Sequence, residues 1–249
     1  MDEVSLNCTK NNTTYEAYRF FIQGIPEALL MLELRAGNQE GLKLKVDNLV
    51  SSLNESNLST SQVVLKGDDI HKAMELRKAG LGLLGNMVGD KKAVACIEDT
   101  AVALKDLPAY IEAFDALMES YNQRAVYYAH AGAGELHLRP ILNLKSSEDI
   151  ALFRSITTEV SKLVKKFNGS LSGEHGDGIV RAEFLRMQVG EKNFELMKTI
   201  KNVFDPKGVF NPGKITDAWP MDESLRYTAD RDEPRVETLM DFQDSGGLL

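Results

Sequence analysis

Three of the four histidines of this chain lie in two short segments that are rich in glycine and glutamate. The first segment, His130 to His137, reads HAGAGELH, and the second, Gly173 to Gly178, reads GEHGDG. Imidazole is the commonest metal ligand in proteins and the side chain that titrates near neutral pH. Glycine lets the backbone turn sharply and come close to a ligand. The two segments therefore predict a site for metal binding or proton transfer.

The spacing within the segments indicates which side chains could meet. His130 and His137 would face opposite sides of an unbroken strand, because their separation is odd. A bend or bulge at Gly132-Ala133-Gly134 would bring both imidazoles to one point. Glu174 offers a carboxylate as the third ligand, and two histidines with one carboxylate leave coordination positions open for catalysis. His175 follows directly, so we expect its side chain to diverge from that of Glu174 and to act as a base toward an alcohol.

Simpler interpretations of the same residues stay open. A lone pair of histidines at this spacing seldom binds metal, and GEHG is also typical of a tight turn or an anion-binding nest. We expect Glu135 to be a solvated loop carboxylate and His71 to be a surface residue. Two other functions are therefore possible: a free-standing metal-dependent hydrolase, and a non-catalytic binding module in which both segments are structural turns.

Composition excludes several classes of protein. The chain has 249 residues, of which 43% are hydrophobic and 27% charged, as in an ordinary globular protein. Its net charge of −8 argues against a nucleic-acid surface, which needs a field of Lys and Arg. Cys8 and Cys96 are far apart, so neither a disulfide framework nor a thiolate zinc site is expected. We find no transmembrane run and no signal peptide, and we expect a cytoplasmic protein.

Hydrophobic periodicity predicts strands that alternate with helices. We expect strands at 26–34, 62–65 and 94–97, and on both sides of the glycine break in 125–141. We expect helices at 40–53, 69–84, 107–121, 147–167 and 191–203. The alternation predicts an α+β fold, a ferredoxin-like antiparallel sheet covered by helices, with an extended C-terminal tail. The expected divisions are a loose segment over 1–20, the domain proper over 21–215, and a tail or linker over 216–249.

Three motifs carry a resemblance to a known family. HAGAGELH, SGEHGDG and the later FNPGK, which ends at Lys214, resemble the C-terminal domain of FAD-linked oxidases of the vanillyl-alcohol oxidase superfamily. The branch that looks most similar is the glycolate oxidase and D-lactate or D-2-hydroxyglutarate dehydrogenase group. The resemblance implies oxidation of a 2-hydroxy acid with FAD as cofactor, and it places Asn211 beside the flavin.

The resemblance also implies roles for individual residues. His130, His137 and Glu174 occupy the positions of the ligands of a divalent metal, zinc or manganese. His175 occupies the position of the base that deprotonates the 2-hydroxy acid. Arg77 falls where the family has an arginine that binds the substrate carboxylate.

The chain departs from the family pattern at several substrate-side positions. Gly132-Ala133-Gly134-Glu135 stands where the family commonly reads Gly-Asp-Gly-Asn, and Arg139 stands where other members have Asn. Ile97 corresponds to a second substrate lysine of some members. Arg139 or Arg181 could compensate, because a guanidinium grips a carboxylate with two hydrogen bonds.

The resemblance implies partners as well. The FAD-binding domain of the family precedes the part matched here, and nothing before Pro26 could cradle a dinucleotide, so we expect the chain alone to be inactive and without flavin. The tail, with Met240-Asp241-Phe242 and then Gly246-Gly247, resembles long members that carry an iron–sulfur cluster domain. The expected partners are a small 2-hydroxy acid, the FAD-binding domain and a second copy in a homodimer. Attachment to the inner face of the membrane is a further expected location.

Overall fold

The computed structural model describes residues 1–10, 12–232 and 237–242. The chain divides into two compact units, Met1–Leu84 and Gly85–Leu249, and each is described here by itself. Among the described helices, none combines the length and the apolar character that a membrane crossing requires. Gly246-Gly247, part of the resemblance to iron–sulfur proteins, lies outside the described residues.

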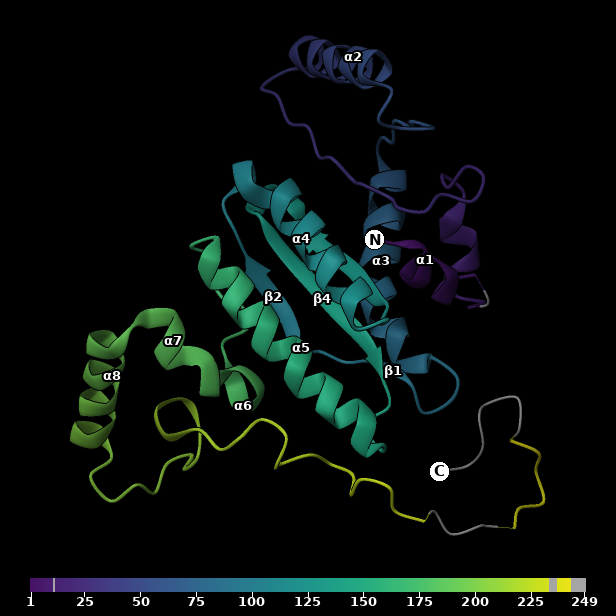
Figure 1. Cartoon of the computed structure of the whole chain (residues 1–249). Helices are drawn as coiled ribbons and strands as arrows, with labels where there is room; N and C mark the ends of the chain where they lie inside the picture. Colours follow the sequence, from purple (N-terminus) through teal and green to yellow (C-terminus); the bar gives the residue numbers. More distant parts are fainter. Residues whose placement is uncertain (11, 233–236, 243–249) are drawn as a thin grey trace. The chain divides into compact units, whose positions relative to one another are not determined.

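The first unit contains helices joined by long extended segments (Figure 1). Its α-helices are α1 (Glu3–Cys8), α2 (Gln39–Ser56) and α3 (Asp68–Leu83), which confirms the helices expected at 40–53 and 69–84. Within residues 1–20, which were expected to be loose, Glu3–Cys8 form α1 and Glu16–Arg19 form a 3-10 helix. The strands expected at 26–34 and 62–65 are wrong. The described residues there are extended but form no ladder, apart from one bridge between Asp2 and Ala28.

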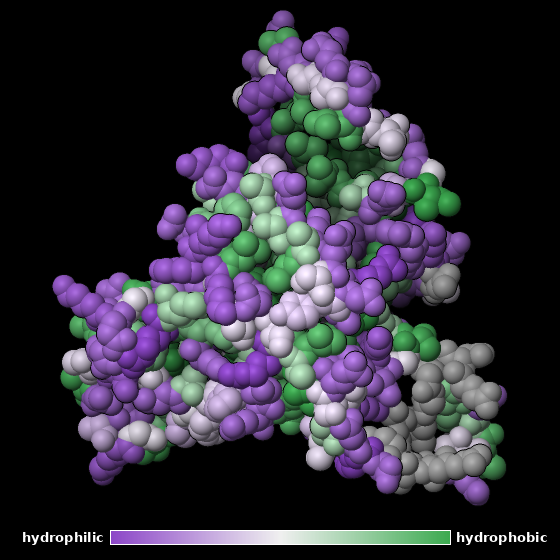
Figure 2. All heavy atoms as spheres, viewed as in Figure 1, coloured by the Kyte–Doolittle hydropathy of each residue, from purple (hydrophilic) through white to green (hydrophobic). Residues whose placement is uncertain are grey.

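Apolar side chains stay exposed in the first unit. α2 has no buried residue, and Leu44 on this helix is 61% exposed. Leu30 and Leu32, in the extended segment before α2, are 75% and 61% exposed. Figure 2 shows apolar side chains gathered beside α2. The apolar run that suggested a strand at 26–34 is therefore present, but the described residues of this unit give it no partner strand.

The second unit is built on a four-stranded antiparallel sheet of β1 (Lys92–Ala93), β2 (Ile97–Ala101), β3 (Ala125–His130) and β4 (Glu135–Leu142). Leu138 of β4 pairs with Ile97 on one side and with Tyr127 on the other, so β4 lies between β2 and β3. The strand expected at 94–97 begins three residues later, as β2. Ala101 also forms an isolated antiparallel bridge with Ser170, so the segment around Ser170 lies beside β2 outside the four strands. This arrangement confirms the expected α+β class.

Two helices cover one face of this sheet (Figure 1). α4 (Leu107–Ser120) and α5 (Ser147–Lys166) confirm the helices expected at 107–121 and 147–167. Leu136 and Leu138 of β4 share a core with Phe114 of α4 and Ile156 of α5. Successive side chains of a strand point to opposite faces, so residues 135, 137 and 139 lie on the face away from these helices. Polar groups on that face can form a site without disturbing the core.

The rest of the second unit packs around this sandwich. It contains α6 (Gly178–Arg181), α7 (Leu185–Val189) and α8 (Glu191–Phe204), the last confirming the helix expected at 191–203. The described residues after Asp217 form neither helix nor strand, which confirms the extended tail. Met221 in this tail is 1% exposed and packs in the main core, and Asp222 pairs with Arg154 of α5 at 2.8 Å. The first part of the tail is therefore anchored to the second unit.

Candidate active site

The hairpin of β3 and β4 brings two histidines to one face of the sheet. His137 lies opposite Tyr128, and His130 lies two residues further along the same side of β3. The two imidazoles are thus diagonal neighbours, with ring centroids 5.4 Å apart. Gly134, with a φ of 75°, closes the turn, and a Cβ there would collide with the carbonyl oxygen of Val102. The expectation that the glycine break brings the two rings together is confirmed, and the break is a hairpin turn.

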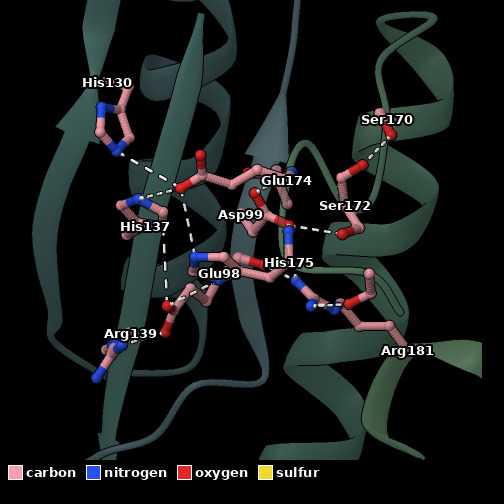
Figure 3. A network of polar contacts seen from close by, with 12 residues as sticks. Glu98, Asp99, His130, His137, Arg139, Ser170, Ser172, Glu174, His175 and Arg181 are labelled. Carbon is pink, nitrogen blue, oxygen red and sulfur yellow. Dashed lines mark hydrogen bonds and ion pairs between the residues drawn. The ribbon is translucent and has the colours of Figure 1, made fainter. Parts of the chain in front are cut away.

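Glu174 reaches both histidines from the loop that follows α5 (Figure 3). Its Oε1 is 3.6 Å from His130 Nε2 and 4.0 Å from His137 Nε2. The three ligand atoms lie within 4.8 Å of one another. The His137 side chain is 2% exposed and that of Glu174 is 50% exposed, so the cluster has a buried wall and an open side. Two imidazole nitrogens and a carboxylate oxygen are ligands that zinc and manganese accept, so this donor set fits a divalent ion.

His175 lies against the same cluster. Its Nε2 is 3.3 Å from Glu174 Oε1, and its Nδ1 is 3.3 Å from Glu98 Oε1. The expected divergence of the Glu174 and His175 side chains is therefore wrong. That expectation assumes an extended backbone, whereas the loop curls and passes through Gly176 with a φ of 77°. The His175 side chain is 43% exposed and remains accessible from solvent.

Two carboxylates of β2, which were not anticipated from the sequence, complete the cluster. The register between β2 and β4 shifts between Glu98 and Thr100, and Asp99 has a φ of 76°. This β-bulge lets the consecutive side chains of Glu98 and Asp99 reach the same face, while Thr100 turns back and accepts a hydrogen bond from Tyr110 of α4. A signal was present in the sequence: two adjacent acids stand inside the apolar stretch 96–102.

Glu98 connects the histidines to an arginine. Its Oε2 is 2.5 Å from Arg139 Nη2, and its Oε1 is 3.3 Å from His175 Nδ1 and 3.8 Å from His137 Nδ1. Glu98 is 5% exposed, and its ion pair with Arg139 offsets part of the cost of burying a carboxylate. A carboxylate beside Nδ1 favours the tautomer in which Nε2 carries the lone pair. The Nε2 atoms of His137 and His175 lie instead 4.0 Å and 3.3 Å from Glu174 Oε1.

Asp99 and Glu135 form a second, deeper carboxylate pair. Glu135 is 7% exposed, so the expectation of a solvated loop carboxylate is wrong; it faces Asp99 across the bulge. The hydrogen bond to Asp99, burial and the charge of Glu174 raise the pKa of Glu135 to about 7. Burial alone would raise the pKa of Asp99, but hydrogen bonds from Glu135, Ser172 and the loop backbone outweigh it and hold that pKa below its ordinary value. Below about pH 7, Glu135 therefore keeps its proton beside an ionised Asp99.

The arginines expected at the site differ in their surroundings. Arg139 pairs with Glu98, and its side chain is 18% exposed. Arg181 donates hydrogen bonds to the carbonyl oxygens of Glu98 and Gly176, which ties β2 to the loop before α6. Arg77 lies on α3 in the first unit and is half-buried there.

Three other residues singled out in the sequence have surroundings of a different kind. Ile97 is fully buried among the core side chains, which accounts for an apolar residue at that position. Asn211 is exposed in the loop after α8, with a φ of 47°. His71 is exposed on α3, which confirms that it is a surface residue.

Comparisons with known proteins identify a family and several relatives of this chain. A family model described as FAD linked oxidases, C-terminal domain, matches residues 1–215. A D-2-hydroxyglutarate dehydrogenase of Haemophilus influenzae is 36% identical over 198 residues, which cover 75% of this chain and 19% of that protein. Glycolate oxidase subunit GlcD of Bacillus subtilis is 23% identical over 84% of this chain and 43% of that protein. A D-lactate dehydrogenase of Archaeoglobus fulgidus is 33% identical over 51% of this chain and 28% of that protein.

The matched region is a small part of the first of these relatives. The aligned parts span 19% to 22% of the D-2-hydroxyglutarate dehydrogenases of Haemophilus influenzae and Escherichia coli. The family match, in contrast, covers most of this chain and includes every residue of the histidine and carboxylate cluster. The chain therefore belongs to the family of FAD-linked oxidase C-terminal domains.

Proposed function

We propose that this chain is the substrate- and metal-binding domain of an FAD-dependent oxidoreductase that oxidises a 2-hydroxy acid to the 2-oxo acid. The observation that carries the proposal is the convergence of His130 Nε2, His137 Nε2 and Glu174 Oε1, with His175 beside them. The relatives are named for D-2-hydroxyglutarate, glycolate and D-lactate, which are all 2-hydroxy acids, and this supports the substrate class.

His130, His137 and Glu174 would hold a divalent ion, zinc or manganese. When bound, such an ion polarises the hydroxyl of the substrate. FAD, held mainly by another domain, supplies the acceptor for the hydride that leaves the carbinol carbon. We assign Asn211 to the border of the flavin, and we include an iron–sulfur domain among the further partners of the complete protein.

The residues of the chain itself would bind the substrate and take one proton. His175 accepts the proton of the substrate hydroxyl at Nε2, and Glu98, 3.3 Å from its Nδ1, stabilises the resulting imidazolium. Loss of that proton and of the hydride converts the alcohol carbon to a carbonyl. We propose that Arg139, which lies on the same face as His137, binds the substrate carboxylate. Arg77 and Arg181 are the other arginines proposed to bind it.

Metal titration of the 249-residue chain tests this proposal. We expect titration calorimetry with Mn²⁺ and Zn²⁺ to detect a single saturable site. His137→Ala should abolish it, because His137 supplies the most buried ligand. His71→Ala is the matched control, since this histidine is exposed on α3 and should leave binding unchanged. Unchanged binding by His137→Ala would contradict the ligand assignment.

A further inference from the structure

Asp99 is a fully buried carboxylate, 0% exposed, in the β-bulge of β2. Burying an ionised carboxylate is costly unless hydrogen bonds replace its water. Asp99 obtains these bonds from a segment far along the chain, residues 172–175 (Figure 3). The loop that carries Glu174 and His175 therefore folds around one side chain.

Besides the hydrogen bond from Glu135, Asp99 accepts hydrogen bonds from four consecutive residues of this loop. Asp99 Oδ1 accepts from the Glu174 N–H at 2.9 Å, and Oδ2 accepts from the His175 N–H at 2.8 Å and from Ser172 Oγ at 2.5 Å. The carbonyl oxygen of Asp99 accepts from the Gly173 N–H at 2.7 Å. Hydrogen bonds to an ionised acceptor are about twice as strong as neutral ones. Asp99 thus fixes the backbone on both sides of the peptide bond that joins Glu174 to His175.

Packing does not hold the two functional side chains of this loop. The Glu174 and His175 side chains are 50% and 43% exposed. Their direction therefore depends on where the backbone places their Cα atoms. Gly173 permits the close approach, because a Cβ there would lie 3.1 Å from Asp99 Oδ1 and 3.2 Å from Glu135 Cδ, and both neighbours are buried.

We propose that Asp99 is the positioning residue of this site: it aims Glu174 and His175 at the histidines of the β3–β4 hairpin without contacting metal or substrate itself. The inference rests on the proposed function and extends it to an element, the bulge of β2, that holds no proposed ligand. It predicts that the site loosens when the carboxylate is lost, even though both functional side chains are still present.

Asp99→Asn is the most specific test of this role, because it changes the hydrogen-bonding groups of the side chain and keeps its size. Asparagine tolerates a positive φ as aspartate does, so the bulge is kept. Its amide offers only one oxygen, and its NH₂ group would face N–H or O–H donors. We expect the Mn²⁺ affinity of the chain to fall about 10–100-fold, the range found when residues that support metal ligands are replaced. Ser172→Ala, which removes only the hydroxyl bond and keeps both amide bonds, should cause a smaller loss.

Amide hydrogen exchange of the metal-free, ¹⁵N-labelled chain gives a second readout that does not depend on the proposed function. The Glu174 and His175 amides should be protected in the unmodified chain and should exchange faster in Asp99→Asn, while the amides of α5 keep their protection. If α5 also loses protection, Asp99→Asn destabilises the whole unit, and Gly173→Ala is used instead. Its methyl group pushes the loop away from an intact Asp99 and should weaken Mn²⁺ binding.

The outcomes separate the two proposals. Protected loop amides in a chain that binds no Mn²⁺ would refute the proposed function, and faster loop exchange in Asp99→Asn would still support the role of Asp99 in holding the loop. Unchanged exchange or unchanged Mn²⁺ affinity in Asp99→Asn would overturn the positioning role. An equal loss in Ser172→Ala and Asp99→Asn would also overturn it, since the hydroxyl bond alone would then account for the effect.

Discussion

The ring of His175 stacks on the ring of His137, with centroids 5.2 Å apart and planes inclined by 13°. The proposed base thus lies against a proposed metal ligand. Burial lowers the pKa of His137, and the neighbouring His175 and His130 lower it further against the opposing charge of Glu98. A metal ligand must be neutral imidazole, so this arrangement keeps His137 in the form that binds a metal.

The stacked pair allows the roles of base and ligand to be separated. In the FAD-containing enzyme, we expect His175→Ala to slow flavin reduction about 10²–10⁴-fold, the usual contribution of a positioned base, with the metal content nearly intact. Glu174→Ala should lose metal and activity together, because its Oε1 approaches both His130 and His137. Rapid-mixing measurement of flavin reduction, together with metal analysis of each variant, measures both effects.

Two results would contradict this assignment. One is a His175→Ala enzyme that reduces its flavin at the parent rate. The other is a His175→Ala enzyme that loses its metal while Glu174→Ala keeps it, which would exchange the two roles. His71→Ala, an exposed histidine on α3, is the control for nonspecific loss.

Glu135 should make the stability of the metal-free chain depend on pH. The hydrogen bond to Asp99 and burial raise the pKa of Glu135 from 4.5 to about 7 in the folded chain. Between these values the folded chain holds a proton that the unfolded chain releases, so stability falls as pH rises through this window, by at most about 1.4 kcal/mol per pH unit. Below the window both states are protonated, and this contribution is fully present.

Glu135→Gln tests the origin of that dependence. Glutamine can still donate a hydrogen bond to Asp99 but does not titrate, so the fall in stability across the window should disappear. Urea unfolding in the presence of a chelator, compared at about pH 5 and about pH 7, measures it. An equal fall in both chains would assign the pH dependence to other groups.

The sequence alone pointed to those candidate residues of the site whose side-chain type and local spacing indicate a chemistry. The scarce histidines and the glycine breaks identified His130, His137 and Glu174, and the helical periodicity located α4 and α5. These features are local, because a turn and an amphipathic stripe are set by neighbouring residues. Glu98 and Asp99 were not predicted as site residues, because their orientation depends on a β-bulge. The bulge gives β2 one extra residue relative to β4.

The wrong predictions for Glu135 and for the strands at 26–34 and 62–65 also depend on contacts between distant parts of the sequence. The burial of Glu135 follows from its pairing with Asp99, a residue of another strand, and no local pattern encodes that contact. The segments 26–34 and 62–65 contain short apolar runs, as strands do, but strand formation requires a neighbour with which to share hydrogen bonds. In the described residues of the first unit they find none beyond the single bridge at Ala28.

The stability of the second unit should depend on the face of α5 that meets the sheet. Phe153 is 1% exposed within the core. We expect Phe153→Ala to lower the free energy of unfolding by about 3–5 kcal/mol, because it leaves a cavity that the core cannot close. Leu196→Ala on α8, where the side chain is 59% exposed, should change it by less than about 0.5 kcal/mol. Denaturant unfolding of both variants measures the two changes in the free energy of unfolding. Similar changes would mean that the packing of α5 against the sheet does not dominate the stability of this unit.

Arg139 can be tested as the group that binds the substrate carboxylate. Its Nη2 is 2.5 Å from Glu98 Oε2, so it already supports one carboxylate, and its side chain is 18% exposed. Arg139→Met keeps much of the side-chain length and removes the charge. Oxalate, an analogue of a 2-oxo acid, should bind the Mn²⁺-loaded variant about 10–100-fold more weakly, the loss expected for a hydrogen bond between charged groups.

The Mn²⁺ affinity decides how that loss is interpreted. If Arg139 binds the substrate, the affinity of Arg139→Met for Mn²⁺ should stay close to that of the unmodified chain, since Arg139 is not a ligand. Arg186→Met on α7 is the matched control, because Arg186 forms exposed pairs with Glu191 and Glu195 and should change neither affinity. A parallel loss of Mn²⁺ and oxalate binding in Arg139→Met would instead mean that the arginine serves Glu98 and the histidines, and that the substrate carboxylate is bound elsewhere.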